Sequence, residues 1–432
     1  MRVVILGGGY TAIWCYRALR RWMGSAADIV VVAPFTQQVF HGFTGEVLDG
    51  ELAPGLQTSP LEECVPHARR VQGWATAVDA ERREVRVEWQ GETTTVAYDE
   101  LVIATGAHDR TDPVPGLAEH GWALRFPGNV PALLDHLALL EAEPAADDRD
   151  ADRRATIVVV GAGFAGTEVA AALGRRYGST RRVVLVSSAD TVVPVWRDRL
   201  SLQEGLRRNL DEAGVEVLTG ARVVAVDAGG VVLGDGSRIA SATVVSTLGN
   251  AVPAIPGLED HQEQDGLLRV DDCLRVTDGV WSAGDAAAVR HGAQRAPKEA
   301  LWAIRAGTRI GRNIARSARR ARPRRFGYRG LGTVAAFAPG HAVATVWGVP
   351  LPQLVGYAVR AVLFLWFVPS RRTALRILRW SLSSRTVATP VPIRVAAEAP
   401  RPLVGIEGGL TAASRLREAV AADGTERRAA GA

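Results

Sequence analysis

The sequence predicts an α/β fold with two similar units, each built on a parallel β-sheet. A short β-branched strand, a glycine turn and a helix occur at the N-terminus and again about 150 residues later. The two strands, residues 3–6 and 157–160, are apolar enough to be buried on both faces of a sheet. The length of 432 residues suits two or three domains. A composition that is 47% hydrophobic and 22% charged excludes a disordered or fibrous chain.

The remaining elements of the first unit follow in order. A helix is expected up to about Met23, and a second buried strand at residues 29–32. Residues 71–96 alternate between apolar and polar side chains, which predicts an antiparallel meander with one solvated face. A further buried strand, residues 101–106, ends in glycine.

The second unit repeats the opening pattern. A helix over about residues 131–142 leads into the charged stretch 143–154, which contains Pro144 and is expected to be a solvated loop between the units. After the strand and glycine turn, a helix is expected at 167–176 and a strand at 183–186.

After the second unit the sequence predicts a helix over residues 299–318, an arginine-rich apolar section and a tail with weak periodicity. The predicted boundaries are 1–125 and 240–325 for the first unit, 126–239 for the second, 326–385 for the C-terminal section and 386–432 for a mobile tail.

Both glycine turns fit the pattern G-x-G-x-x-G/A, which binds the pyrophosphate of a dinucleotide. In the first turn Gly7 allows the tight turn, Gly9 lets the backbone approach the pyrophosphate, and Ala12 permits close helix packing. The helix behind the turn offers free N–H groups and a partial positive charge to phosphates. The second turn has glycine at all three positions: Gly161, Gly163 and Gly166. Two matches, each between a strand and a helix, predict two Rossmann-like dinucleotide-binding domains.

The acid that usually follows such a turn by about 20 residues, and binds a ribose 2′-hydroxyl, is missing from both units. The corresponding positions hold Ala33 and Ser187. In the second unit this removes a reason to prefer NADH over NADPH, but the nearest arginine, Arg197, is too distant along the chain to be assigned to a 2′-phosphate. In the first unit it predicts weaker or differently anchored binding.

These motifs, with the strand end Ala104-Thr105-Gly106 and the run 277–285 that closes in Gly284-Asp285, occur in an order that resembles the two-dinucleotide-binding-domain flavoproteins. That superfamily includes the pyridine nucleotide–disulfide oxidoreductases. The resemblance implies FAD in the first unit and NAD(P)H in the second unit, which is inserted into the first. It places Asp285 at the ribityl–phosphate region of FAD; a helix N-cap is the alternative. The expected cofactor-binding residues are Gly7, Gly9, Tyr10, Thr11, Ala12, Ala104, Thr105, Gly106, Gly161, Gly163, Phe164, Ala165, Gly166, Glu168, Gly249, Gly284 and Asp285.

Within the superfamily the chain is most similar to the type II NADH dehydrogenases, which are single-subunit NADH:quinone oxidoreductases of the membrane surface. The resemblance covers residues 2–385. Glu168 matches a family glutamate that contacts the nicotinamide; an acid favoured by the helix dipole is the alternative. The glutamines of the family's quinone motif are replaced here by Leu301, Arg305 and Ala306.

The three cysteines, Cys15, Cys64 and Cys273, are far apart, so a disulfide framework, a zinc site and an active-site dithiol are not expected. Each is expected to be buried and inert. Sulfide:quinone oxidoreductases are also similar overall but need cysteines near the flavin. Because no secretory signal is recognised, the protein is expected in the cytoplasm.

The C-terminal section is strongly basic. Residues 301–385 contain 16 arginines and no lysine, aspartate or glutamate, so the rest of a chain with net charge +5 carries −11. The apolar stretch 354–368 has Arg360 as its only charge and is too short for the roughly 20 residues of a membrane span. The next helix is expected to be amphipathic and to lie on an anionic membrane. A solvated face packed on the body, or a nucleic-acid patch, is the alternative. Its arginine face holds Arg372, Arg376 and Arg379, and its leucine face holds Leu375, Leu378 and Leu382.

We therefore expect an enzyme, an FAD-dependent NAD(P)H oxidoreductase that reduces a quinone-like acceptor and is bound to the cytoplasmic face of the membrane. The catalytic candidates are Glu168, Lys298, Trp302 and Arg305. Lys298, the one lysine of the chain, either stabilises a reduced anion or is an ordinary exposed charge. Neither a metal nor a nucleic acid is expected, and a homodimer is left open. The alternatives are a soluble reductase of an iron–sulfur protein or metabolite, and a non-catalytic flavin- or nucleotide-binding sensor.

Overall fold

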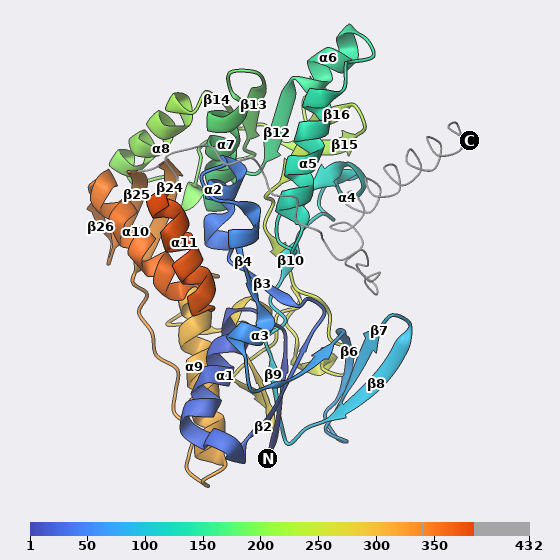
Figure 1. Cartoon of the computed structure of the whole chain (residues 1–432), viewed down its shortest axis with the longest axis vertical. Helices are drawn as coiled ribbons and strands as arrows, with labels where there is room; N and C mark the ends of the chain where they lie inside the picture. Colours follow the sequence, from blue (N-terminus) through green and yellow to red (C-terminus); the bar gives the residue numbers. More distant parts are fainter. Residues whose placement is uncertain (339, 384–432) are drawn as a thin grey trace.

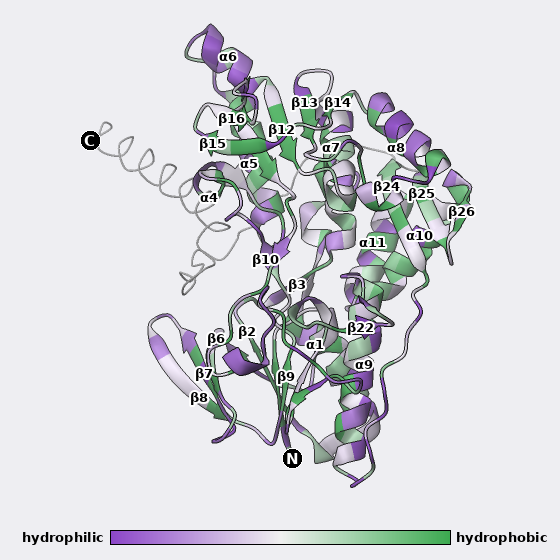
Figure 2. Cartoon of the chain, turned by 180° about the vertical axis from the view of Figure 1, so that it is seen from behind, coloured by the Kyte–Doolittle hydropathy of each residue, from purple (hydrophilic) through white to green (hydrophobic). Residues whose placement is uncertain are grey.

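The computed structural model describes residues 1–338 and 340–383 (Figure 1). The predicted mobile tail, 386–432, lies outside the described residues. Two sheets, the first mainly parallel and the second entirely parallel, lie one above the other along the long axis, and a smaller C-terminal section lies beside them. The predicted α/β fold class is confirmed. Figure 2 shows hydrophobic residues on the central strands of both sheets and on the C-terminal section.

The first sheet combines strands from two distant parts of the chain. β1 lies near its centre and pairs in parallel with β2 on one side and β9 on the other. After the second unit the chain returns to this sheet, where β21 pairs in parallel with β9. From edge to edge the strands are β20 (Arg275–Thr277), β21 (Val280–Ser282), β9 (Glu100–Ile103), β1 (Arg2–Leu6), β2 (Asp28–Ala33) and β5 (Arg69–Gln72).

Two helices that are distant in sequence, α1 (Tyr10–Met23) and α9 (Ala300–Ser317), cover one face of this sheet and cross very closely. A Cβ on Gly307 would lie 2.3 Å from the Thr11 carbonyl oxygen, so only glycine allows this approach. The helix predicted at 299–318 is confirmed. The opposite face is covered by the predicted antiparallel meander, which is formed by β6 (Trp74–Asp79), β7 (Glu84–Trp89) and β8 (Glu92–Ala97).

The second sheet is entirely parallel. Its strands, in order, are β11 (Gly121–Trp122), β18 (Thr243–Ser246), β12 (Thr156–Val160), β13 (Arg182–Val186) and β14 (Val215–Leu218). The helices α5 (Asn129–Ala142), α7 (Phe164–Tyr177) and α8 (Leu200–Glu212) share one hydrophobic cluster with this sheet. A second meander packs on its other face and comprises β15 (Val223–Asp227), β16 (Gly230–Leu233) and β17 (Arg238–Ala240).

The expected solvated loop at 143–154 is wrong in part, because it contains the helix α6 (Asp148–Arg154). This helix has no buried residue, and therefore no apolar pattern announces it. It is stabilised locally instead. The Asp147 side chain caps it by accepting the N–H of Asp150 at 2.8 Å, and the Asp150 carboxylate pairs with Arg153 and Arg154 one turn later.

The two units are joined where the chain crosses between them. β10 (His108–Asp109) leads out of the first unit and pairs in antiparallel fashion with β19 (Asn250–Ala251), which leads back. The Asp109 carboxylate also accepts the backbone N–H groups of Leu124 and Arg125, at 3.0 and 2.8 Å, and so fixes the segment that enters the second unit.

The C-terminal section is a small antiparallel sheet with two helices. β24 (Gly332–Ala338) packs on α7, and α10 (Gln353–Phe367) packs on β25 (His341–Val346). β26 (Val349–Leu351) forms the edge of the sheet, and α11 (Arg371–Ser383) follows α10. Of the helices in the described part of the chain, none has the length and apolar character needed to cross a membrane.

The expectation for the cysteines is confirmed for two of the three. All three are free thiols, and Cys15 and Cys64 are buried. Burial raises the pKa of Cys64 to about 12, so this thiol is unreactive at neutral pH. The expectation is wrong for Cys273, which is only half-buried because it lies in a turn.

Candidate active site

The first glycine turn lies at the carboxyl end of β1. Gly7 has φ +113°, and a Cβ there would come within 2.2 Å of the Ala104 carbonyl oxygen. Gly9 is different: its φ of −86° suits any residue, and no described atom lies within 4 Å of the position that a Cβ would take. The backbone at Gly7 is therefore packed against Ala104. The space beside Gly9, the residue just before α1, is open.

The predicted residues of the first site converge on this turn. Ala104 contacts Gly7, and a Cβ on Gly284 would lie 2.5 Å from the Thr11 hydroxyl. The Thr105 hydroxyl is buried and has no hydrogen-bond partner among the described residues. A buried polar group without a partner is costly, so this hydroxyl indicates a missing polar ligand.

Asp285 is paired across the junction of the two units. Its carboxylate accepts a hydrogen bond from Arg125 at 3.3 Å, and Arg125 also donates to the Asn250 side chain at 3.2 Å, next to Gly249. The alternative that Asp285 caps a helix is not seen. Sequence reasoning missed Arg125 because no motif surrounds it.

The second glycine turn repeats the geometry of the first. Gly161 has φ +106°, and a Cβ there would lie 2.8 Å from the Thr247 carbonyl oxygen. A Cβ on Gly166 would lie 1.8 Å from the Gly161 carbonyl oxygen. Gly163 is again the open position, with no described atom within 4 Å of a Cβ. The next two predicted residues, Phe164 and Ala165, begin α7.

Ser187, at the position of the missing acid, is buried after β13, and its hydroxyl accepts the N–H of Ala189 at 3.2 Å. Arg197 forms an ion pair with Asp190 at 2.6 Å, which brings it close to the residues that follow Ser187. Ser187 therefore supplies no carboxylate for a ribose, and the Arg197 guanidinium is paired with Asp190.

Glu168 links the second unit to the C-terminal section. It is in α7, and its carboxylate accepts the N–H of Ala336 in β24 at 2.8 Å. Burial raises the pKa of Glu168 to about 7, against the opposing effect of the Arg360 guanidinium. The group can therefore gain or lose a proton near neutral pH.

Replacing Glu168 by glutamine is expected to change how stability depends on pH. Because the pKa of about 7 in the folded chain exceeds the usual 4.5, the protonated carboxyl stabilises the fold below about pH 4.5, and this contribution is lost as the pH rises through 7. The melting temperature of the variant minus that of the wild type should therefore increase from about pH 5 upwards and become constant above about pH 8. Replacement of the exposed Glu204 by glutamine should show no such trend, and a difference independent of pH would contradict the assignment.

Arg360 is the second residue whose importance sequence reasoning missed. It is 5% exposed, forms an ion pair with Glu46 of α2 (Thr44–Leu48) and donates to the Gly42 carbonyl at 2.6 Å. Its guanidinium carbon lies 4.2 Å from the centre of the Phe364 ring. The sequence did contain a sign of this role, because Arg360 is the one charge in an apolar helix, and such a charge is rarely buried without a partner.

The other catalytic candidates lie around the start of α9. Lys298 is exposed, and Trp302 is 5% exposed. Both line a cavity of about 50 Å³, together with Gly284 and Asp285. Arg305 is not among its lining residues, and its guanidinium lies 5.7 Å from the ring of Tyr328, which also packs against Trp302. Glu168 contacts different residues, so the four candidates do not form one cluster.

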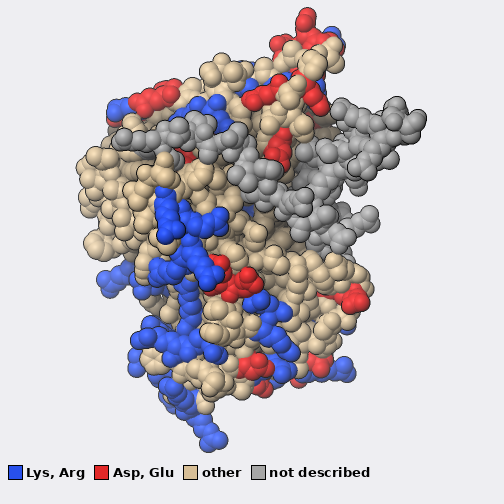
Figure 3. Space-filling view, viewed as in Figure 1, with Lys and Arg blue, Asp and Glu red and all other residues tan. Residues whose placement is uncertain are grey.

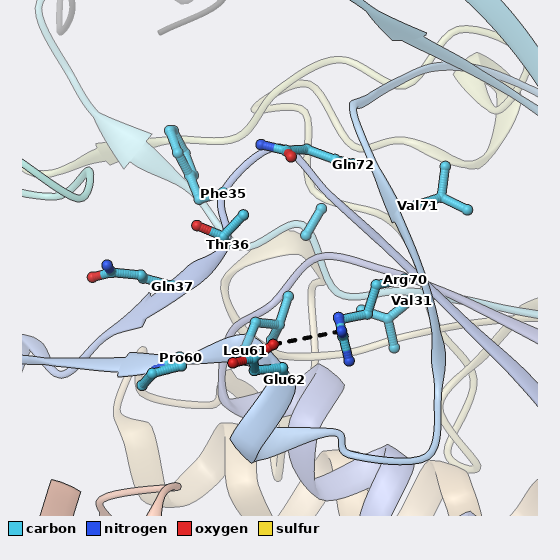
Figure 4. A pocket seen from close by; sticks show the side chains of 11 residues that line it. Val31, Phe35, Thr36, Gln37, Pro60, Leu61, Glu62, Arg70, Val71 and Gln72 are labelled. Carbon is cyan, nitrogen blue, oxygen red and sulfur yellow. Dashed lines mark ion pairs between the residues drawn. The ribbon is translucent and has the colours of Figure 1, made fainter. Parts of the chain in front are cut away.

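A larger cavity, of about 380 Å³, lies at the carboxyl end of β2, where Ala33 replaces the expected acid (Figure 4). This volume lies within the range of about 300–1,000 Å³ that is usual for small-molecule sites. Sequence reasoning had not predicted it. Its lining residues are Val31, Ala33, Phe35, Thr36, Gln37, Pro60, Leu61, Glu62, Arg70, Val71 and Gln72.

Strand ends with open glycine turns, repeated in two sheets, define a class of nucleotide-dependent redox proteins. The chain belongs to the pyridine nucleotide-disulphide oxidoreductase family, which it matches over residues 1–307. It is thus an oxidoreductase, and the relatives below confirm the resemblance to type II NADH dehydrogenases.

Three relatives show how far the similarity extends. An NADH dehydrogenase-like protein of Mycobacterium tuberculosis is 33% identical over 308 residues, which cover 67% of this chain and 73% of the relative. The type II NADH:quinone oxidoreductase NdhA of the same species is 28% identical, covering 90% of this chain and 92% of its own. The demethylphylloquinone reductase NdbB of Synechocystis is 28% identical, covering 88% and 95%.

Solved structures agree with the fold. NDH2 from Plasmodium falciparum, in complex with NADH, matches with a TM-score of 0.79 over 89% of this chain and 98% of its own, at 13% identity. The sulfide:quinone oxidoreductase of Aquifex aeolicus matches with a TM-score of 0.68, over 89% and 96%, at 15% identity. At these identities the likeness concerns the fold alone.

Proposed function

We propose that this chain is an FAD-dependent NAD(P)H oxidoreductase that passes electrons to a quinone-like acceptor at a membrane surface. The observation that carries the proposal is the repeated glycine turn, whose middle position, Gly9 or Gly163, is open in both units. The relatives named as NADH:quinone oxidoreductases support the choice of donor and acceptor.

The residues of the first unit, 1–125 and 240–325, fit FAD. Gly9 leaves room for a pyrophosphate, the Thr105 hydroxyl lacks a partner among the described atoms, and Asp285 offers a carboxylate held by Arg125. FAD, when bound, supplies hydride acceptance and onward electron transfer, while the protein supplies position and charge. Residues 126–239 would hold NAD(P)H on the second turn.

Glu168 is the proposed proton-holding group beside the nicotinamide, because its pKa of about 7 allows both protonation states at neutral pH. Lys298 and Trp302 are proposed to lie near the flavin, since they share a cavity with Asp285. Arg305 is the weakest catalytic candidate, because it is exposed and its ring contact is with Tyr328.

The function is tested with purified protein. It should be yellow, lose its colour when NADH or NADPH is added without oxygen, and regain it when a short-chain quinone follows. If the nicotinamide nucleotide bleaches the flavin but the quinone does not reoxidise it, the acceptor is not a quinone. A colourless protein that binds no added FAD would refute the proposal.

Attachment to a membrane surface is supported by α11 and α10. Leu375, Leu378 and Leu382 are 47%, 42% and 78% exposed, although they lie on the apolar face of α11. On α10, Val362 and Trp366 are 69% and 53% exposed. Figure 3 shows basic side chains gathered over α11 and around the far end of α9, and acidic ones over α6. An exposed apolar face beside arginines is typical of a helix that lies in a membrane interface.

Reversing the three charges of α11, by replacing Arg372, Arg376 and Arg379 with glutamate, should release the protein from anionic vesicles. At about 1 kcal/mol for each arginine near the surface, removal alone should weaken binding by roughly 100-fold at low salt. Sedimentation with phosphatidylserine vesicles measures this. As a control, three exposed arginines elsewhere, Arg149, Arg222 and Arg290, are changed to glutamate. Equal losses in both variants would contradict a specific role of α11.

A further inference from the structure

The cavity at the end of β2 lies beside the first glycine turn. Gly7 donates its N–H to the Val32 carbonyl at 2.7 Å, so the turn is hydrogen-bonded to the carboxyl end of β2. A Cβ on Gly8 would lie 3.3 Å from the Leu61 side chain and 3.7 Å from the Ala33 Cβ. The turn, the end of β2 and α3 (Leu61–Cys64) therefore meet at the cavity.

In a parallel nucleotide-binding sheet, the adenosine ribose lies where β2 ends, and a carboxylate there accepts hydrogen bonds from its hydroxyls. Ala33 cannot do so. Among the described residues that line this cavity, Glu62 carries the one carboxylate. It comes from α3, on the other side of the cavity from β5, and not from β2 (Figure 4).

Arg70 lies beside this carboxylate. It pairs with Val31 in the register of β2 and β5, and its guanidinium lies 3.7 Å from the Glu62 carboxylate. Gln72, two residues further along β5, lines the same cavity. Both partners of the ion pair are partly exposed, so the pair contributes little to folding stability and is accessible to a ligand.

We propose that Glu62 replaces the missing acid of the first unit and binds the ribose of the adenosine half of FAD, with Arg70 holding its carboxylate in place. The small side chain of Ala33 leaves the space across which Glu62 reaches the ribose. Val31 and Leu61, which share a hydrophobic cluster with Ala33, supply apolar surface there. This inference rests on the proposed function, since it requires FAD in the first unit.

The test measures FAD affinity and needs no turnover. Protein stripped of flavin is titrated with FAD and with FAD whose adenosine lacks the 2′-hydroxyl, and the quenching of flavin fluorescence is followed. Wild-type protein should bind the deoxy compound about tenfold more weakly, as expected for one lost hydrogen bond to a charged group. Glu62→Ala, which removes the acceptor oxygens, should bind FAD about tenfold more weakly than wild type and should no longer distinguish the two compounds. The matched control, Glu81→Ala, removes an exposed carboxylate from the β6–β7 turn and should behave like wild type.

The outcomes separate this inference from the proposed function. Failure of the wild type to bind FAD at all would refute the proposed function. Tight FAD binding by a wild type that does not distinguish the deoxy compound would overturn the role of a carboxylate at the ribose, and this result needs no variant to fold. A Glu62→Ala variant that still distinguishes the two compounds would overturn the role of Glu62.

Discussion

Replacing Arg360 by glutamine should destabilise the protein by about 3–5 kcal/mol, the usual effect of removing one partner of a buried ion pair. Glu46, 16% exposed in its side chain, would be left as a charge without its partner, and the Gly42 carbonyl would lose a donor. The same guanidinium opposes the raised pKa of Glu168, so that pKa should rise further in the variant. Thermal and denaturant unfolding of the full chain measure the loss.

The matched control for this change is Arg372→Gln on α11. The Arg372 side chain is 85% exposed, so its replacement should alter stability by no more than about 0.5 kcal/mol. A double variant, Glu46→Leu with Arg360→Met, removes both charges and should regain much of the stability lost by Arg360→Gln. If Arg360→Gln unfolds like the control, the ion pair does not hold the C-terminal section on the first unit.

Valine at the middle glycine of a turn should weaken cofactor binding strongly without destabilising the protein. Valine at the first glycine should both weaken cofactor binding and destabilise the protein. Gly9 has an ordinary extended φ and free space around its Cβ position, so flavin-free Gly9→Val should melt at the same temperature as flavin-free wild type. The side chain would instead occupy the approach of the pyrophosphate, and FAD affinity should fall by roughly 100-fold or more, equivalent to about 3 kcal/mol. Gly7→Val would bring a side chain against the Ala104 carbonyl at a φ of +113°, and should melt at a lower temperature.

The same two substitutions in the second turn test the binding of NAD(P)H. Gly163→Val should retain the flavin and lose NAD(P)H, while Gly161→Val should also lower the melting temperature. Flavin absorbance and titration with NADH, measured on all four variants, assign each turn to its ligand. Loss of flavin in Gly163→Val at an unchanged melting temperature would contradict the assignment.

The fold was predictable because its pattern is local. A buried parallel strand, a glycine turn and a helix lie within about 25 residues, and each leaves its own periodicity in the sequence. The open and closed glycines of both turns follow from the same motif. The helix α6 was missed for the opposite reason, since capping and ion pairs stabilise it and no buried face reveals it.

The charged contacts of the site were not predictable, because they join residues far apart in the chain. Arg360 and Glu46 are 314 positions apart, and Arg125 and Asp285 are 160 apart. No spacing rule connects such residues, and only the folded chain brings them together. The absence of an acid at Ala33 was evident from the sequence. Its replacement across the cavity by Glu62 was not, because residues 34–60, with α2 among them, separate α3 from β2 along the chain.

The pairing of β10 with β19 gives the second unit two neighbouring ends, as an independent domain has. His108 lies opposite Ala251, and the flanking strands β9 and β21 remain hydrogen-bonded neighbours in the first sheet. Both ends of the second unit are therefore fixed at one place, so that its sequence can vary without breaking the strand pairings of the first sheet.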